Sequence, residues 1–483
     1  MWYMCSHATP DQSAWRPNEG PPVSHSGGRE PAVSLGLLDA TMVGIGAMIG
    51  AGIFVLTGLA VDISGPAAII AFALNGGVTT FTALSYAELA AAIPRNGGGY
   101  AYVREVFSAP VAFVMGWTRW FTYMIAGSLY ALGFASNFVE FGHIYGYALP
   151  GPPVLYALGA VVTLVALNAL STEASGRGET AITLLKIAIL GVFVAFGLTA
   201  ADAGEFDPLF TEGPLSVLPA MGLTFIAFQG YDLIATVTEE VENPQVNIPR
   251  AILLSVAVTV VVYLLVVFVA IGTLGADGLA GAGETAIAQA AEGFMPTFPI
   301  LGTGAALIAF GAVFSTVSAL NAVVIGSSRV AFAMGRERQL PARLGRFHHR
   351  YGTPLVAILA SAVVMLVAVL VVPIRIVGNL ASLFSLLGFI IVNYALIRLR
   401  RRQPNLQRPF EVPLYPVTPV LGIVCNVLLG LFIDWFTWAL AIGWLVVGGG
   451  VYLLLSRRGD VGPVGPPEIQ EPEPIESTEG AND

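Results

Sequence analysis

The chain has 483 residues, of which 55% are hydrophobic and only 11% charged, with a net charge of −9. Soluble domains carry about 25% charged residues, so this chain has too little polar surface to coat itself in water. Its two cysteines, Cys5 and Cys425, show no CxxC spacing and suggest neither a disulfide framework nor a thiolate metal site. The composition predicts an integral membrane protein.

The two ends of the chain differ in composition from the middle. Residues 1–34 are rich in Pro, Ser and Gly and hold no apolar core, which predicts a disordered tail rather than a cleavable signal. Residues 466–483 contain six acidic residues and no basic one, so 457–483 is predicted to be an acidic, disordered tail. A membrane domain is expected between the tails, at residues 35–456.

Twelve apolar runs are long enough to span a bilayer, which needs roughly 20 residues per helix. The fold class is therefore predicted to be an all-α polytopic membrane protein of about twelve helices. The eighth run is too long for one span and is expected to extend into the cytoplasm, while a tight hairpin at Ile433-Asp434 joins the last two. The runs are 35–61, 66–93, 110–139, 153–171, 179–201, 215–238, 250–275, 298–334, 354–373, 376–399, 416–433 and 435–456.

Arginine is distributed unevenly between the loops. If the amino terminus is inside, the cytoplasmic connections contain fourteen arginines and the outer ones contain one, Arg375. Basic residues favour cytoplasmic loops, and an even number of spans returns the chain to the same side. Both termini are therefore expected in the cytoplasm.

Four glycines lie within nine residues of the first span, from Gly44 to Gly52. Glycine in a helix interior costs about 1 kcal/mol relative to alanine, so the cluster has a reason other than helix stability. One interpretation is a packing seam, since Gly46 and Gly50 form GxxxG; the other is a broken helix. A dinucleotide site is excluded because the spacing is GxGxxxG and no strand precedes it.

The sixth span contains a similar interruption, with glycine and polar groups in mid-span at residues 225–232. Unpaired backbone in lipid is tolerated only at a cavity. Interrupted helices at the first and sixth positions indicate a transporter with inverted repeats, formed here by helices 1–5 and 6–10. Half-helix amino termini can bind a carboxylate, and unwound carbonyls can bind an ammonium group, so a zwitterion fits.

Several motifs occur in order along the chain and resemble those of the amino acid–polyamine–organocation superfamily of permeases. The resemblance covers residues 35–456 and implies a leucine-transporter-type fold with two additional helices. The motifs are the glycine-rich segment 46–54, Pro-x-x-Gly-Gly-x-Tyr-x-Tyr-x-Arg at 94–104, Glu-Glu-Val-Glu-Asn-Pro at 239–244 followed by Ile-Pro-Arg at 248–250, Ser-Arg at 328–329 with Met-Gly-Arg at 334–336 and Leu-Pro at 340–341, and Arg-Pro-Phe at 408–410 with Pro413.

The resemblance also implies a substrate site at the two breaks. The backbone of Gly50, Ala51 and Gly52 would hold a carboxylate, main-chain carbonyls near Met48, Ile226 and Gln229 would hold the amino group, and Phe225 or Phe228 would close over the side chain. Ala51 stands where some relatives carry a hydroxyl, which leaves only backbone donors. The predicted substrate-binding residues are Met48, Ile49, Gly50, Ala51, Gly52, Phe225, Ile226, Phe228, Gln229 and Gly230. Neither a cofactor nor a metal is expected.

Lys186 is the only lysine of the chain and lies about seven residues into the fifth span. It could snorkel to the interface. However, a lysine within a span costs about 2.5–3.5 kcal/mol, which favours a functional role. In similar permeases a fifth-helix lysine takes the place of a sodium ion and touches first-helix carbonyls. Since burial disfavours the charged form, such a lysine could load and unload a proton, so proton-linked or ion-independent transport is predicted over sodium coupling.

Two charged residues in the spans and one histidine pair in a loop are further polar positions of interest. Arg119 lies near the middle of the third span and would either repel cationic substrates or pair with Asp232. Glu88, near the cytoplasmic end of the second span, is expected to be structural. His348-His349 lies in a basic loop and is interpreted as a solvated pair rather than a metal site.

These features predict a secondary active transporter that carries amino acids across the plasma membrane by alternating access. A permease for polyamines or other organic cations is the alternative substrate class. A membrane enzyme is disfavoured because no HExxH, GxSxG or Asp-rich motif occurs, and a transporter-like sensor because the short tails offer no signalling domain. The expected partners are the amino acid and the lipid bilayer, without nucleic acid. The identity of the amino acid, symport or exchange, and monomer or homodimer stay open.

Overall fold

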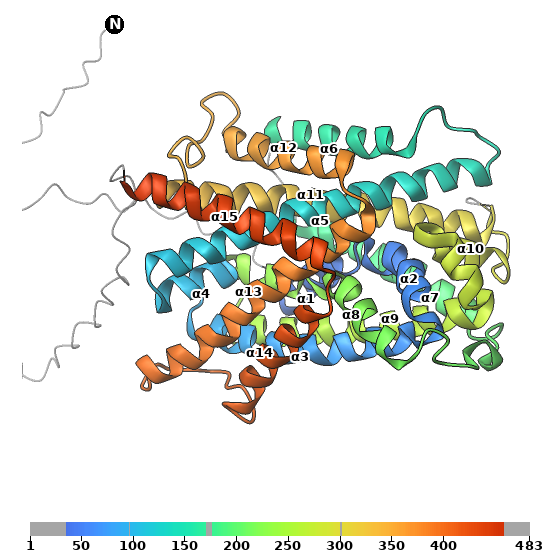
Figure 1. Ribbon diagram of the computed structural model, residues 1–483, viewed down its shortest axis with the longest axis horizontal. Coiled ribbons are helices and arrows are strands. Elements are labelled where there is room, and N and C mark those ends of the chain that lie inside the picture. Colours follow the sequence, from blue (N-terminus) through green and yellow to red (C-terminus); the bar gives the residue numbers. More distant parts are fainter. Residues whose placement is uncertain (1–34, 96, 171–175, 300–301, 458–483) are drawn as a thin grey trace, which may run out of the picture.

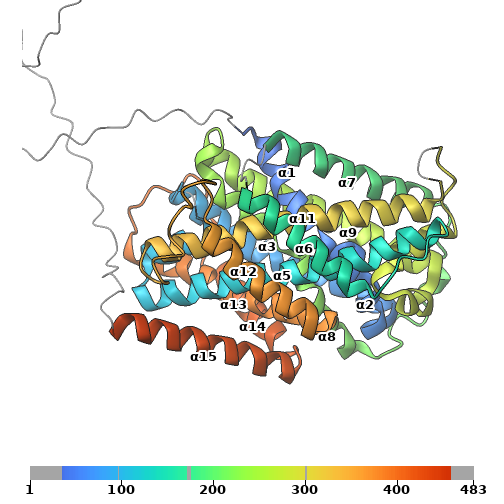
Figure 2. The same ribbon diagram turned by 90° about the horizontal axis from the view of Figure 1, so that it is seen from above.

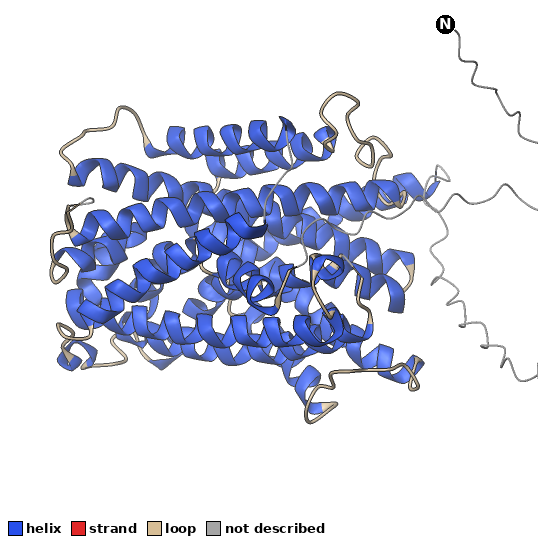
Figure 3. Ribbon diagram, turned by 180° about the vertical axis from the view of Figure 1, so that it is seen from behind, coloured by secondary structure: helices blue, strands red, loops and turns tan. Residues whose placement is uncertain are grey.

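The computed structural model describes residues 35–95, 97–170, 176–299 and 302–457. These residues form helices and short connecting loops, with no strand longer than an isolated bridge (Figure 3). The predicted tails at 1–34 and beyond Arg457 lie outside the described residues. The α-helices are α1 Leu37–Met48, α2 Ala51–Ser64, α3 Ala68–Ala92, α4 Gly98–Val106, α5 Ala109–Ile144, α6 Pro153–Leu170, α7 Gly176–Gly197, α8 Val217–Thr224, α9 Pro244–Ala282, α10 Ala286–Glu292, α11 Gly304–Arg336, α12 Leu355–Val371, α13 Ile374–Arg402, α14 Val417–Leu431 and α15 Trp435–Arg457.

The predicted polytopic all-α class is confirmed. Eight of the described segments are long and apolar enough to cross a membrane, and the apolar helices α12 and α14 are shorter. One of the eight, Leu37–Ala92, contains two spans, since the chain turns at Gly65 between α2 and α3. Helix α5 has 36 residues, which is long enough to cross a membrane, and it packs against α11 and α13. The described segments thus agree with the expected number of helices.

The helices pack in layers. Helices α6 and α12 lie side by side on one flank, over α5 and α11, and α3 lies with α9 on the opposite flank (Figure 1). Helix α15 runs along the edge of the bundle and contacts α5 and α13 (Figure 2). Large apolar side chains of α6, α12 and α15, such as Leu167, Val363 and Val446, are exposed, as expected of surfaces that face lipid.

Two helices and one boundary differ from the sequence-based expectation. Helix α4 forms within the motif at 94–104, where only a loop was expected, and the short α10 lies between two spans. The eighth run was expected to begin at residue 298, but the helix begins at Gly304, where Thr303 caps it by accepting a hydrogen bond from the Ala306 N–H at 3.2 Å. Glycine-rich and short amphipathic segments carry too weak a periodicity to show such helices.

Glu88 has the structural role expected of it. Its carboxylate is fully buried and accepts two hydrogen bonds of 2.6 Å from the Arg400 guanidinium. It also accepts a hydrogen bond of 2.7 Å from the backbone N–H of Val412. A buried charge requires such pairing. The bonds fasten the loop before α14 to α3 and α13.

Candidate functional site

The first span is broken at its centre. Helix α1 ends at Met48, Ile49 and Gly50 are non-helical, and α2 begins at Ala51. The Gly50 N–H donates to the Met48 carbonyl at 2.7 Å. Of the two interpretations of the glycine cluster, the broken helix is therefore confirmed. Within the described residues, the N–H groups of Ala51 and Gly52 make no hydrogen bond, as is usual for the first turn of a helix.

The sixth span is broken at the corresponding position. Helix α8 gives way to a 3-10 turn at Phe225–Phe228, Gln229 is extended, and Gly230 has φ of 142°. A second 3-10 segment, Tyr231–Thr236, follows. Only glycine adopts the φ of position 230 without strain.

The two breaks cross in direct contact. A methyl group at Gly52 would lie 2.4 Å from the Ala227 Cβ, and one at Gly230 would lie 2.7 Å from the Met48 nitrogen. Both distances are too short for a real contact, so both positions require glycine. The unwound backbone of each helix thus supports that of the other.

Two hydroxyl groups hold the crossing. The Tyr263 hydroxyl lies 2.6 Å from the carbonyl oxygen of Met48 and 3.0 Å from that of Ala227, so α9 contacts both breaks with one group. The Ser315 hydroxyl of α11 lies 2.6 Å from the carbonyl oxygen of Ile49 and 3.1 Å from that of Gly50. Each hydroxyl has one proton and donates to one of its two carbonyls at a time, so the carbonyls released by the interruption share these protein donors.

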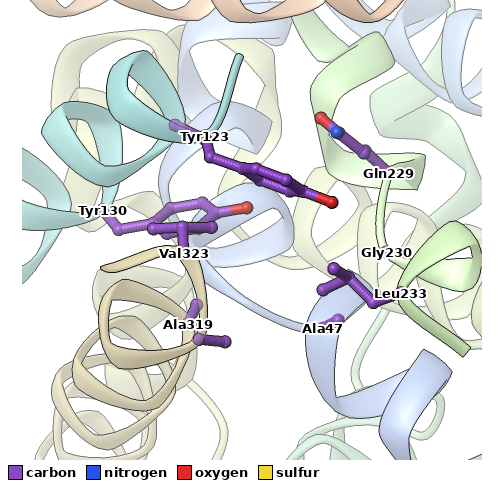
Figure 4. Close-up of a pocket in the computed structure, with 10 residues that line it drawn as sticks. Ala47, Tyr123, Tyr130, Gln229, Gly230, Leu233, Ala319 and Val323 are labelled. Atoms are coloured by element: carbon purple, nitrogen blue, oxygen red, sulfur yellow. The ribbon is translucent and has the colours of Figure 1, made fainter. Parts of the chain in front are cut away.

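A small central pocket of about 20 Å³ lies beside the crossing (Figure 4). Figure 4 shows the Tyr123 ring of α5 extending toward Gly230 and Leu233, with Tyr130 beside it. Apart from the Tyr123 and Tyr130 hydroxyls and the Gln229 amide, the lining side chains are apolar and mostly small. The lining residues are Ala47, Tyr123, Ala126, Tyr130, Gln229, Gly230, Leu233, Ala319, Ala322 and Val323.

A larger cavity of about 600 Å³ continues from the central pocket. Ala47, Tyr123, Leu233 and Ala322 line both. The larger cavity, called the vestibule below, reaches Leu35 at the start of α1, Gly97 and Tyr100 at α4, and Glu240, Arg329 and Ala333. It therefore extends from the middle of the bundle to the end where α1 begins.

One rim of the vestibule is held by polar contacts between α4 and the end of α11. The Tyr100 hydroxyl and the Arg104 guanidinium both contact the Glu337 carboxylate. Burial, together with the neighbouring Glu337 carboxylate, raises the pKa of Tyr100 well above its ordinary value. The phenol therefore stays protonated and can act as a donor at this rim.

The opposite end of the pathway is tightly packed. A methyl group at Gly58 would lie 2.1 Å from the Gly283 carbonyl oxygen, and one at Gly133 would lie 2.5 Å from a Val55 methyl group. The Asn137 amide donates to the Glu284 carbonyl at 3.3 Å. Helix α2, α5 and the segment before α10 thus meet there. The described structure is open toward one end of the bundle and closed toward the other.

Comparison with known proteins agrees with this architecture. Residues 35–451 match the amino acid permease family. The chain is 30% identical over 450 residues to the branched-chain amino acid permease BcaP of Bacillus subtilis, an alignment covering 90% of this chain and 95% of that protein.

The chain belongs to the amino acid permease family.

Two other relatives from Bacillus subtilis carry different substrate names. The methylthioribose transporter is 30% identical over 88% of this chain and 94% of its own length. The serine/threonine exchanger SteT is 29% identical over 80% of this chain and 88% of its own length. Family membership establishes a membrane transporter and not an enzyme, as predicted, and supports an amino acid as the substrate.

Lys186 is completely buried in this permease. Its Nζ donates to the carbonyl of Gly46 in α1 at 3.0 Å and to the hydroxyl of Ser318 in α11 at 3.2 Å. The side chain therefore points inward between the first broken helix and α11 and does not snorkel to the interface.

Arg119 is also buried, and it forms an ion pair with Asp232 of the second 3-10 segment. Of the two interpretations made from sequence, the pairing is confirmed. The same guanidinium nitrogen, Nη2, donates to the Tyr123 hydroxyl at 2.8 Å. Both charged residues line the vestibule.

The sequence-predicted site residues separate into three groups. Gln229 and Gly230 line the central pocket, and Gly50 lies beside it, since a methyl group there would be 2.8 Å from the Ala319 Cβ. Phe225 packs against Phe389 and Phe228 against Phe72 and Tyr263, away from the pocket lining. The remaining predicted positions, Met48, Ile49, Ala51, Gly52 and Ile226, are buried in the crossing itself.

The pocket walls that come from unbroken helices are not among the residues predicted from the sequence. Tyr123 and Tyr130 of α5, and Ala319 and Val323 of α11, lie in regular helix. The spacing of seven residues between the two tyrosines places them on one face of α5. This spacing is only a weak signal for the two tyrosines, because packing residues on one helix face share it.

The contact of Tyr263 with both breaks predicts a large effect of Tyr263→Phe. Loss of the hydroxyl leaves the Met48 and Ala227 carbonyls without this donor, at a cost of about 1–3 kcal/mol. Since these carbonyls lie at the crossing, we expect KM for uptake to rise about tenfold or more. Tyr156→Phe is the matched control, because the Tyr156 hydroxyl is exposed and contacts only the local Pro150 carbonyl. Equal KM values for the two variants would contradict the role of Tyr263.

Proposed function

We propose that the protein is a secondary transporter that moves neutral amino acids across the cell membrane by alternating access. The crossing of the two broken helices is the observation that carries the proposal. It places the unbonded N–H groups at the start of α2 close to unwound backbone of the sixth span. Donors and acceptors at such a crossing suit the carboxylate and the ammonium group of one zwitterion.

The two cavities support a cycle of access. The vestibule leads away from the central pocket toward the end where α1 begins, while the other end is packed around Gly58 and Gly133. With the orientation favoured by the arginines, the vestibule opens to the cytoplasm, both termini are cytoplasmic, and the conformation is inward-open. Outward opening would separate α2 and α5 from the segment before α10.

The lining disfavours the alternative of a polyamine or other organic cation. Among the described residues that line the two cavities, the carboxylates are Asp232, which is paired with Arg119, and Glu240 at the wide end. A di- or polycation would need uncompensated carboxylates in the pocket. The small apolar side chains from α5 and α11 suit an uncharged substrate side chain instead.

Lys186 supports proton-linked rather than sodium-coupled transport. Its ammonium group contacts the carbonyl oxygen of Gly46 in the first helix. A sodium ion bound there would contact the same oxygen, so the lysine would take the place of that ion. Gain and loss of a proton on this nitrogen would change the bond between α1 and α7. Because Ser318 of α11 accepts from the same nitrogen, the change would also reach the opposite wall of the pathway.

Uptake of a radiolabelled panel into proteoliposomes tests the proposal. The panel contains neutral, cationic and anionic amino acids and a polyamine, each under an imposed proton gradient, a sodium gradient or neither. We expect uptake of neutral amino acids that an inward proton gradient accelerates. If only the polyamine is taken up, the substrate is a polyamine and not a neutral amino acid. If only a sodium gradient accelerates uptake, the coupling role of Lys186 is refuted.

A further inference from the structure

One nitrogen of Arg119 joins two walls of the substrate pathway. Nη2 contacts the Tyr123 hydroxyl on its own helix, α5, and the Asp232 carboxylate on the second 3-10 segment. Tyr123 lines both the central pocket and the vestibule. The guanidinium therefore ties an aromatic wall of the pocket to the broken sixth helix.

The second oxygen of Asp232 extends this connection to the break. Asp232 Oδ1 accepts a hydrogen bond of 3.2 Å from the backbone N–H of Gly230. Gly230 is in contact with Ala47 and Met48 of the first break. A continuous chain of contacts thus runs from Arg119 through Asp232 and Gly230 to the crossing.

The pair also sets the charge of the pathway. The Arg119 and Asp232 side chains are only 5% and 1% exposed, so solvent screens them poorly. An Asp232 carboxylate without Arg119 would place an uncompensated negative charge on the wall between pocket and vestibule. Such a charge attracts cations and disfavours anions.

We propose that Arg119 is a positioning and specificity residue of the transporter. It holds Tyr123 and Asp232 in place around the pocket and cancels the Asp232 charge, so that amino acids with neutral side chains are accepted and cationic ones rejected. This inference rests on the proposed transport of neutral amino acids.

The test compares norleucine with lysine, because lysine is norleucine with a terminal ammonium group. Uptake of radiolabelled norleucine into proteoliposomes gives KM, and unlabelled lysine gives an inhibition constant. Hydrogen bonds to charged groups are strong, so for Arg119→Gln we expect KM to rise about tenfold. We also expect the ratio of the lysine inhibition constant to the norleucine KM to fall about tenfold or more, because the lone carboxylate attracts lysine.

The double variant Arg119→Gln/Asp232→Asn separates charge from positioning. With neither charge present, rejection of lysine should return to the wild-type ratio, while KM for norleucine stays raised. The double variant also guards against misfolding, because removal of both partners leaves no buried charge unpaired. If only the double variant folds, an unchanged norleucine KM in it would overturn the proposal.

Arg375→Gln is the matched control, since Arg375 forms an ion pair with Asp62 and the two side chains are 46% and 39% exposed. We expect its KM and lysine rejection to equal those of the wild type. The inference is overturned if folded Arg119→Gln keeps the wild-type KM and selectivity, or if single and double variants reject lysine equally. A wild type that takes up no amino acid would instead refute the proposed function.

Discussion

Replacing Gly230 with alanine is expected to reduce uptake about 100-fold or more. The residue has φ of 142°, which costs a residue with a side chain about 1–3 kcal/mol. The added methyl group would also lie 2.7 Å from the Met48 nitrogen and 2.8 Å from the Ala47 Cβ, at a further cost of about 1–3 kcal/mol. The clash is relieved only if the broken first and sixth helices move apart, and this movement would disrupt the substrate site predicted at their crossing. Initial rates of uptake by reconstituted Gly230→Ala measure the effect.

Two other glycines provide controls that separate the causes. Gly213 has φ of 79° but nothing within 4 Å of an added methyl group, so Gly213→Ala carries the backbone strain without the clash. Gly77, in α3, also has open space and carries neither cost. We expect near-wild-type uptake from both. If Gly213→Ala loses as much uptake as Gly230→Ala, or if Gly230→Ala takes up substrate at the wild-type rate, transport does not depend on the contact between the two breaks.

Lys186→Ala is expected to abolish the acceleration of uptake by a proton gradient. The variant removes the donor to the Gly46 carbonyl and the buried group proposed to take up the proton. A hydrogen bond from a charged group is worth about 1.5–3 kcal/mol, so gradient-driven uptake should fall about tenfold or more. Exchange of labelled for unlabelled amino acid without a gradient should persist at a reduced rate. The ratio of rates with and without the gradient is the quantity to measure.

Thr183→Val is the matched control for Lys186→Ala. Thr183 lies on the same helix and its hydroxyl donates to the Met42 carbonyl of α1 at 3.2 Å. The variant thus removes a contact between α1 and α7 without removing a proton carrier. We expect the response to the gradient to survive in Thr183→Val. Survival of the full response in Lys186→Ala would show that another group couples transport to protons.

The positions of the two breaks could be predicted because helix interruption has a local cause. Glycines that destabilise a helix, together with polar groups in mid-span, are visible in the sequence at Gly50 and Gly230. The pocket walls on α5 and α11 have no such signal, because Tyr130 or Ala319 in a regular apolar helix looks like any packing residue. Which face of a helix meets a cavity is decided by tertiary packing.

The packing of the aromatic residues in the sixth span is not visible in the sequence. Phe225 and Phe228 stand next to the break in sequence, and closure of one of them over the substrate stays a prediction. The 3-10 geometry places residues three apart on the same side, and both rings contact α3, α9 or α13. A local change from α to 3-10 pitch rotates side chains, and the sequence alone does not reveal it.

Competition by three analogues tests most directly whether a zwitterion binds at the crossing. Norleucine carries both groups, pentylamine is norleucine without the carboxylate, and hexanoate is norleucine without the ammonium group. If first-turn N–H groups of α2 bind the carboxylate and unwound carbonyls bind the ammonium group, only norleucine should inhibit uptake of a labelled neutral amino acid. Each truncated analogue should bind about 100-fold more weakly, because it leaves buried polar groups unpaired. Inhibition by pentylamine or hexanoate as strong as that by norleucine would contradict the zwitterion site.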